Sequence, residues 1–146
     1  MKKSEPVIVE QTYNASIDKV WNAITDRDQM REWFFDTIDS FKPEVGFETQ
    51  FNVRANDKDY LHLWKVTDVV AGKKITFNWK YPDYPGDSYV TVELSSKNNL
   101  TILKLTHEGI ESFPRDNPDF SRESCSKGWD FLIRKSLKEF LDKNKK

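Results

Sequence analysis

Apolar and polar residues alternate through most of the middle of the chain, a pattern typical of strands with one buried face. The clearest case runs from Lys74 to Lys80, where Ile75, Phe77 and Trp79 alternate with polar residues. Similar segments rich in β-branched and aromatic residues recur along the chain. They predict strands at residues 6–13, 37–41, 47–53, 60–70, 74–80, 90–94 and 101–107.

Turn-forming segments separate these strands and should reverse the chain direction. The predicted turns are Pro43–Gly46, Asn56–Asp59, Ala71–Lys73 and Lys97–Asn99. Two longer irregular loops, Tyr81–Asp87 and Ile110–Pro118, combine prolines with aromatic residues. That composition fits either the rim of a cavity entrance or stiff surface turns.

The spacing of apolar residues changes to that of helices on either side of this region. Ser16 is a typical N-cap residue, and Asp26 with Gln29 resembles the capping box of a second short helix carrying Met30 and Trp33. The apolar face of the first helix consists of Ile17, Val20, Trp21 and Ile24.

A long amphipathic helix is predicted near the C-terminus. Phe131 lies off its apolar face, so it packs on a sheet edge or is exposed. Gly128 lies within the helix, where glycine is unfavourable, and indicates close packing or a local adjustment. The apolar face consists of Cys125, Trp129, Leu132, Ile133, Leu137, Phe140 and Leu141.

The order of elements predicts an α+β fold. We expect a single domain over residues 1–146, with a curved antiparallel sheet of about six to seven strands, two short helices and one long helix. Aromatic residues make up 14% of the chain. Because an aromatic, curved sheet covered by one helix need not fill its own interior, we expect a hydrophobic cavity between them.

Charge and cysteine content narrow the functional classes. The 23 basic and 24 acidic residues are mixed along the chain, without the basic excess of a nucleic-acid-binding protein. Lys143, Lys145 and Lys146 instead suit a helix C-terminus. The single cysteine, Cys125, excludes an internal disulfide and fits a reducing compartment. With no signal peptide and no long apolar stretch, we expect a cytoplasmic protein without stable membrane insertion.

Metal and cofactor motifs are absent from the sequence, so we expect neither group. Of the two histidines, His107 shares strand parity with Leu103 and Leu105 and should face inward. It is then either a hydrogen-bonding group of the cavity, able to act as acid or base, or a core histidine whose ring nitrogens are hydrogen-bonded within the protein. The direction of His62 stays open because both faces of its strand carry apolar residues.

Several motifs in this order resemble the START-like, birch-pollen-allergen-like (SRPBCC) superfamily. Within it, the chain is most similar to the branch named for homologues of the activator of the heat-shock-protein-90 ATPase. The resemblance covers nearly the whole chain, from about Val7 to Leu141, and is carried by a set of shorter segments. They are Tyr13–Trp21, Ile24–Asp26, Trp33, Ile75–Trp79, Thr101–Gly109 and Gly128–Trp129.

This resemblance implies a helix-grip fold with a hydrophobic cavity between the sheet and the C-terminal helix. Members of the superfamily carry lipids, sterols, flavonoids or polyketides, and a minority catalyse cyclisation or dehydration of such ligands. We expect Trp129 to face Phe77 and Trp79 across the cavity. The candidate ligand-binding residues, each of which also fits a plain core, are Trp33, Phe51, Trp64, Phe77, Trp79, His107, Trp129 and Ile133.

Three functions are open at this point. Binding of a small hydrophobic ligand, such as a lipid, sterol or polyketide-like molecule, fits the aromatic faces best. A chaperone ATPase-activating interaction protein rests on the branch resemblance, although the co-chaperone carries a domain beyond this one. A polyketide cyclase or aromatase would need polar groups in the cavity, for which His107, Tyr89 and Glu108 are the candidates. We expect a monomer or homodimer, and binding rather than catalysis.

Overall fold

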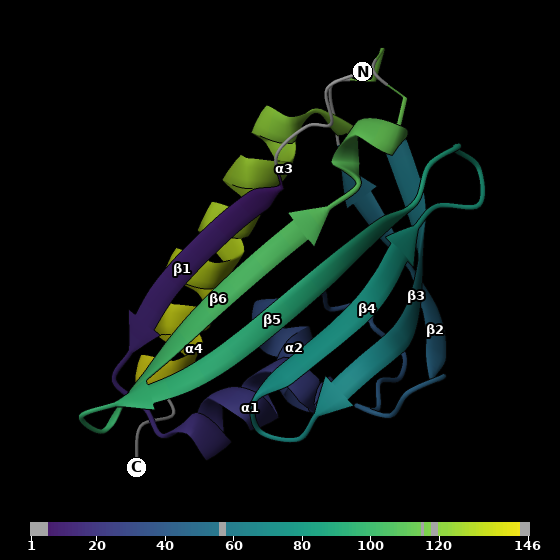
Figure 1. Cartoon of the computed structure of the whole chain (residues 1–146). Coiled ribbons are helices and arrows are strands. Elements are labelled where there is room, and N and C mark those ends of the chain that lie inside the picture. The colour runs from purple at the N-terminus through teal and green to yellow at the C-terminus, as the bar shows by residue number, and fades with distance from the viewer. Residues whose placement is uncertain (1–5, 56–57, 115, 118–119, 144–146) are drawn as a thin grey trace.

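Six antiparallel strands form one sheet, as the alternation predicts. The computed structural model describes residues 6–55, 58–114, 116–117 and 120–143. Parts of three predictions, at residues 56–57, 118 and 145–146, lie outside these ranges. The strands are β1 (Val7–Tyr13), β2 (Glu48–Ala55), β3 (Lys58–Val70), β4 (Lys74–Lys80), β5 (Ser88–Lys97) and β6 (Leu100–Glu108). Their order across the sheet is β1-β6-β5-β4-β3-β2 (Figure 1).

Two short helices, α1 (Ile17–Thr25) and α2 (Arg27–Trp33), follow β1 directly. Both predicted N-caps are confirmed. The Ser16 side chain accepts the backbone N–H of Lys19 (3.3 Å), and the Asp26 carboxylate accepts that of Gln29 (3.2 Å). These bonds satisfy amide groups that the first helical turn leaves free, so local sequence fixes where both helices begin.

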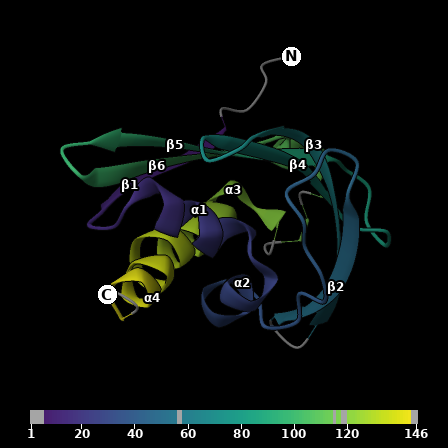
Figure 2. The ribbon, with the colours of Figure 1, turned by 90° about the horizontal axis from the view of Figure 1, so that it is seen from below.

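The C-terminal helical segment consists of α3 (Arg122–Trp129), η3 (Asp130–Ser136) and α4 (Leu137–Lys143), with a short 3₁₀ turn, η1 (Ile110–Ser112), before it. Figure 2 shows the sheet bending from β1 towards β2 around the helices, all of which lie on its inner face. This is the helix-grip fold that the resemblance implies.

The register of the sheet aligns buried side chains in rows on its inner face. One row crosses five strands through Val66, Phe77, Val90, His107 and Val7, all of them buried. Because side chains alternate between faces, the positions three residues away along four of these strands lie on the outer face, where they form a row of alternating charge. That outer row is Lys74, Glu93, Lys104 and Glu10.

The open question about β3 is settled by the burial of its side chains. His62 is buried on the inner face together with Tyr60, Trp64 and Val66. Leu61 and its odd-numbered neighbours are less buried. Sequence could not decide this because both faces of the strand carry apolar residues.

The strand predicted at Thr37–Phe41 is wrong, since residues 34–47 form an irregular connector between α2 and β2. Ile38 and Phe41 are buried there, whereas the residues between them are exposed, which is not a strand alternation. The carbonyl groups of Asp36 and Asp39 in this connector accept hydrogen bonds from side chains of α2, whereas Gly46 and Phe47 at its end bond to the backbone of Val66 in β3.

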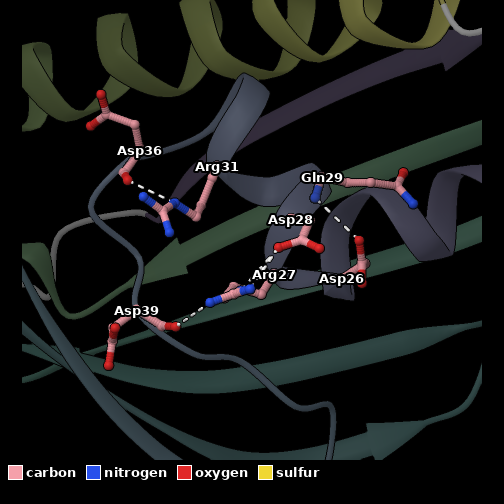
Figure 3. Close-up of polar contacts among 7 residues, drawn as sticks. All are labelled: Asp26, Arg27, Asp28, Gln29, Arg31, Asp36 and Asp39. Atoms are coloured by element: carbon pink, nitrogen blue, oxygen red, sulfur yellow. Dashed lines mark hydrogen bonds and ion pairs between the residues drawn. The ribbon is translucent and has the colours of Figure 1, made fainter.

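Two arginines of α2 hold the connector in place (Figure 3). Arg27 Nη1 donates to the carbonyl oxygen of Asp39 (3.2 Å), and Arg31 Nε donates to that of Asp36 (2.9 Å). Arg27 also pairs with Asp28 (2.8 Å). These bonds fix the backbone that carries the aromatic side chains described below.

The long C-terminal helix is confirmed in extent but not in regularity, because η3 is a π-helical segment. Such segments arise where the i→i−4 hydrogen-bond pattern widens, often near functional sites. Tyr13 from β1 donates its hydroxyl hydrogen to the carbonyl of Ile133, and Ser136 donates to the carbonyl of Trp33. As predicted, Phe131 lies off the apolar face, with 55% of it exposed.

We expect Tyr13→Phe to lower the free energy of unfolding by about 1–2 kcal/mol, because the buried hydroxyl bonds the π-helical segment to β1. Urea unfolding followed by tryptophan fluorescence measures this change. Tyr89→Phe is the matched control, since Tyr89 is 43% exposed on the outer face and its change should stay within about 0.5 kcal/mol. Equal effects of both substitutions would contradict the role given to Tyr13.

Candidate ligand-binding cavity

A cavity of about 150 Å³ lies between the inner face of the sheet and the α3 end of the C-terminal helix. The helix supplies one wall, formed by Cys125, Gly128, Trp129 and Leu132. Gly128 is exposed, and a Cβ atom added there would have no atom within 4 Å. The cavity therefore meets solvent beside Gly128. The sequence predicted either close packing or a local adjustment of the helix at this glycine, and the close packing is wrong.

The other walls come from segments far apart in the sequence. The sheet and the residue after β4 contribute Trp79, His107 and Tyr81. The second loop region contributes Ile110, Phe113 and Phe120, and the α2–β2 connector contributes Phe35. Both loops predicted to rim an entrance thus line the cavity through their described residues.

A chain of hydrogen bonds joins the helix to the sheet beside the cavity. The Trp129 indole N–H donates to Nδ1 of His107 (3.0 Å). Because an indole nitrogen can only donate, Nδ1 carries no hydrogen and the ring hydrogen sits on Nε2. Nε2–H then donates to Oγ of Ser88 (2.9 Å), and the Ser88 hydroxyl donates to the carbonyl oxygen of Trp79 (2.7 Å).

This geometry keeps His107 and its neighbour Cys125 uncharged. Cys125 Sγ lies 3.3 Å from His107 Nδ1, which carries no hydrogen of its own. Burial lowers the pKa of His107 to about 4. Burial also raises the pKa of the Cys125 thiol to about 12, against smaller opposing contributions from Trp129 and Arg122. A thiolate–imidazolium pair would put a hydrogen on Nδ1 facing the Trp129 N–H, so the arrangement opposes such a nucleophile.

The two rim loops are fastened to each other at Ser112. Its Oγ accepts the backbone N–H of Asp87 (2.8 Å) and lies 2.6 Å from the carbonyl oxygen of Gly109. Gly86 has a φ of +120°, and a Cβ atom there would lie 2.5 Å from Cδ1 of Phe113. Only glycine therefore lets the first loop approach Phe113, which closes one end of the cavity.

Aromatic rings pack around that end of the cavity in a second cluster. Tyr60, Phe113 and Phe120 are buried there, with Tyr81 and Tyr84 packed against them. The Tyr81 and Phe120 ring centroids are 5.0 Å apart, and those of Tyr60 and Phe120 are 5.4 Å apart. Because these rings support one another, the loop side chains that line the cavity are held by packing on both sides.

Of the eight predicted site residues, Trp79, His107 and Trp129 line the cavity. The Trp79 and Trp129 ring centroids are 5.5 Å apart at 70°, so these two rings meet edge to face, whereas Phe77, the other predicted partner of Trp129, does not line the cavity. A second void of about 20 Å³ in the core touches Trp129 again, together with three further members of the predicted set. Those three are Trp33, Phe77 and Ile133.

Phe51 and Trp64 do not line the cavity but pack behind its wall, against Phe35 and Trp79 respectively. The Phe51 and Trp64 ring centroids are 4.6 Å apart at 87°, an edge-to-face contact. Tyr89 and Glu108, named as possible catalytic groups, are opposite each other on the outer face and exposed. That expectation was wrong, because their strand parity is opposite to that of the buried His107.

The sequence did not single out Phe35, Tyr81 or Phe120 as site residues. Phe34 stacks between Trp33 and Phe35, with ring centroids 4.9 Å and 4.6 Å away, so the end of α2 forms an aromatic stack. The run of three consecutive aromatic residues was the available signal. The aromatic residues in the two loops were a second signal.

Among the described residues, no group of three His, Cys, Asp or Glu side chains is placed to hold a metal ion. None of the helices described here is long and apolar enough to cross a membrane.

A family model described as "Activator of Hsp90 ATPase homolog 1-like protein" matches residues 14–142. The chain belongs to this family. The match spans both N-terminal helices, most of the sheet and the C-terminal helix, so the suspected branch is confirmed. No curated protein matches the chain.

Several solved structures share the fold of this chain. The Mll3558 protein of Rhizobium loti has 24% sequence identity and a TM-score of 0.80, covering 93% of this chain and 96% of its own. Protein MLL2253 of Mesorhizobium loti has 25% identity and a TM-score of 0.75, covering 97% and 99%. PFC0360w, an HSP90 activator from Plasmodium falciparum, has 22% identity and a TM-score of 0.68, covering 97% and 96%.

We expect the stability of this family member to fall in mild acid. Burial lowers the pKa of both His107 and His62 from 6.5 to about 4, in His62 against an opposing bond to the Tyr60 carbonyl. As pH drops below 6.5 the unfolded chain takes up protons first. The free energy of unfolding should therefore fall by on the order of 2 kcal/mol per histidine between pH 7 and pH 5. This pH range lies above the one in which most carboxylates titrate.

Urea unfolding at pH 7 and pH 5 measures this loss. His107→Gln and His62→Gln should each lower stability at pH 7 but reduce the difference between the two pH values by about half. A pH dependence unchanged in both variants would show that the histidines are not its source.

Proposed function

We propose that this protein binds a small hydrophobic molecule in the cavity between the sheet and the C-terminal helix. The observation that carries the proposal is the wall itself: aromatic and aliphatic side chains, with no Asp, Glu, Lys or Arg among its described residues. Binding sites for small molecules are concave and mostly apolar, with few polar groups. The opening beside Gly128 gives such a molecule access to the cavity.

The state of the polar groups favours binding over catalysis. A general acid or base needs a pKa near the working pH and a free position toward its substrate. Both ring nitrogens of His107 are engaged, and its pKa is about 4. Cys125 is a protonated thiol at neutral pH. A carrier or receptor is therefore supported better than a cyclase.

The second candidate is regulation of a chaperone ATPase. It is supported by the family description and by the structural likeness to the HSP90 activator of Plasmodium falciparum. Such a role would use the outer surface instead of the cavity. The exposed large apolar residues among those described, such as Ile8, Val45 and Phe131, lie on different elements and give this candidate less support.

We expect native mass spectrometry of freshly purified protein to show an extra mass in stoichiometric amount that disappears after extraction with organic solvent. Analysis of the extract then identifies the ligand class. Acid-unfolded protein is the control for covalent modification, which would persist. A clean mass without ligand, together with capture of the cell's own Hsp90 by the tagged protein, would favour the second candidate.

We expect Gly128→Leu to reduce ligand occupancy at least tenfold without loss of stability. A Cβ atom added at Gly128 has no atom within 4 Å, and Gly128 lines the cavity where it opens, so a leucine side chain should reduce access to it. Leucine also favours the helix by roughly 0.8 kcal/mol over glycine. Lys127→Leu is the matched control, because it adds the same side chain one position away at an exposed site. Occupancy equal to that of the unsubstituted protein in Gly128→Leu would place the ligand elsewhere.

A further inference from the structure

The size of the cavity limits what it can enclose. Its volume is about 150 Å³. An apolar protein cavity of about that volume is known to bind benzene, whereas pockets for drug-sized ligands measure roughly 300–1,000 Å³. One six-membered ring with a short substituent therefore fills this cavity. A sterol or a fused polyketide would have to leave most of its surface in solvent beside Gly128.

The walls are suited to a flat ring. Rings of Phe35, Trp79 and Trp129 come from the connector, the sheet and the helix, and neighbouring pairs meet at 70°. Phe113 and Phe120 close the loop side, with ring centroids 5.5 Å apart. An aromatic guest can make edge-to-face and offset-stacked contacts with such walls, which a saturated ring of the same size cannot.

The charge of the walls sets the charge of the guest. No acidic or basic side chain is present in the described lining, and both His107 and Cys125 are uncharged at neutral pH. A carboxylate or ammonium group entering this space would lose its hydration without gaining a counter-ion, which is costly. The guest must therefore be neutral.

Tyr81 supplies one polar contact. Its hydroxyl oxygen accepts the indole N–H of Trp79 (2.8 Å). In the part of the chain that the structure describes, its own hydrogen has no acceptor, and burial raises the pKa of this phenol so that the hydrogen is retained. The His107 nitrogens are already engaged. Among the described lining residues, the Tyr81 hydroxyl is thus the one donor left without an acceptor.

We propose that the cavity takes an uncharged, single-ring aromatic molecule with one hydrogen-bond acceptor, such as an aryl ketone, aldehyde or ether, whose oxygen receives the Tyr81 hydroxyl hydrogen. This inference rests on the proposed function and narrows its ligand class.

A panel of matched probes tests the ligand class by isothermal titration calorimetry and ligand-observed NMR on the unsubstituted protein at pH 7.4. Acetophenone should bind. Ethylbenzene, which lacks the acceptor, should bind about fivefold more weakly. Benzoate, cyclohexyl methyl ketone and 2-acetylnaphthalene should each bind at least tenfold more weakly, because they change charge, flatness and size in turn.

Tyr81→Phe separates the hydrogen bond from the shape of the cavity. It should lower the affinity for acetophenone to that for ethylbenzene and leave the ethylbenzene affinity unchanged. Tyr84→Phe is the control, since Tyr84 packs in the same aromatic cluster but outside the described cavity wall. Equal loss for both probes in Tyr81→Phe would overturn the role of its hydroxyl.

Two outcomes distinguish this inference from the proposed function. Benzoate or 2-acetylnaphthalene binding as tightly as acetophenone, or a fatty acid as the extracted ligand, would overturn the ligand class while leaving a hydrophobic binding site. If neither a single-ring nor a larger apolar probe binds, and native mass spectrometry shows no ligand, both proposals fail.

Discussion

The hydrogen bond from Trp129 to His107 joins the C-terminal helix to the sheet, and the cavity depends on it. An indole N–H buried in an apolar interior is costly without an acceptor, and for Trp129 the unprotonated Nδ1 of His107 provides one. This hydrogen bond fixes the tautomer of His107, whose Nε2–H then donates to Ser88. The Ser88 hydroxyl in turn donates to the backbone carbonyl of Trp79. The polar groups of His107 and Ser88 are thereby satisfied within the protein, and the space beside them is left neutral and largely apolar.

The helix packs differently at its two ends. Towards α4, Ile133 and Leu137 are fully buried, and Tyr13 bonds to the π-helical segment, so sheet and helix meet without a large void. Towards α3, loops join the inner face of the sheet opposite the helix. Five aromatic rings and a glycine-dependent close approach at Gly86 fill most of the space but not all of it. The cavity is what remains.

The fold is shared with proteins of about a quarter identity or less, which shows how little it depends on particular side chains. Inner-face residues need only be apolar and of suitable size to cover the sheet. The cavity, in contrast, depends on which side chains end the strands and fill the loops. Members of one family can therefore keep the same architecture and enclose different spaces.

The sequence by itself determined the elements whose residues interact with near neighbours. The caps at Ser16 and Asp26 and the alternation in β4 and β6 all rest on local hydrogen bonds or on the two-residue period of a strand. The strand predicted from Thr37 to Phe41 was wrong because the backbone there bonds to a side chain of α2, a contact that the local sequence pattern does not reveal. Only the tertiary structure brought Phe35 and Tyr81 together around one cavity. Parity tells which face a side chain takes, whereas an enclosed volume depends on distances between elements remote in sequence.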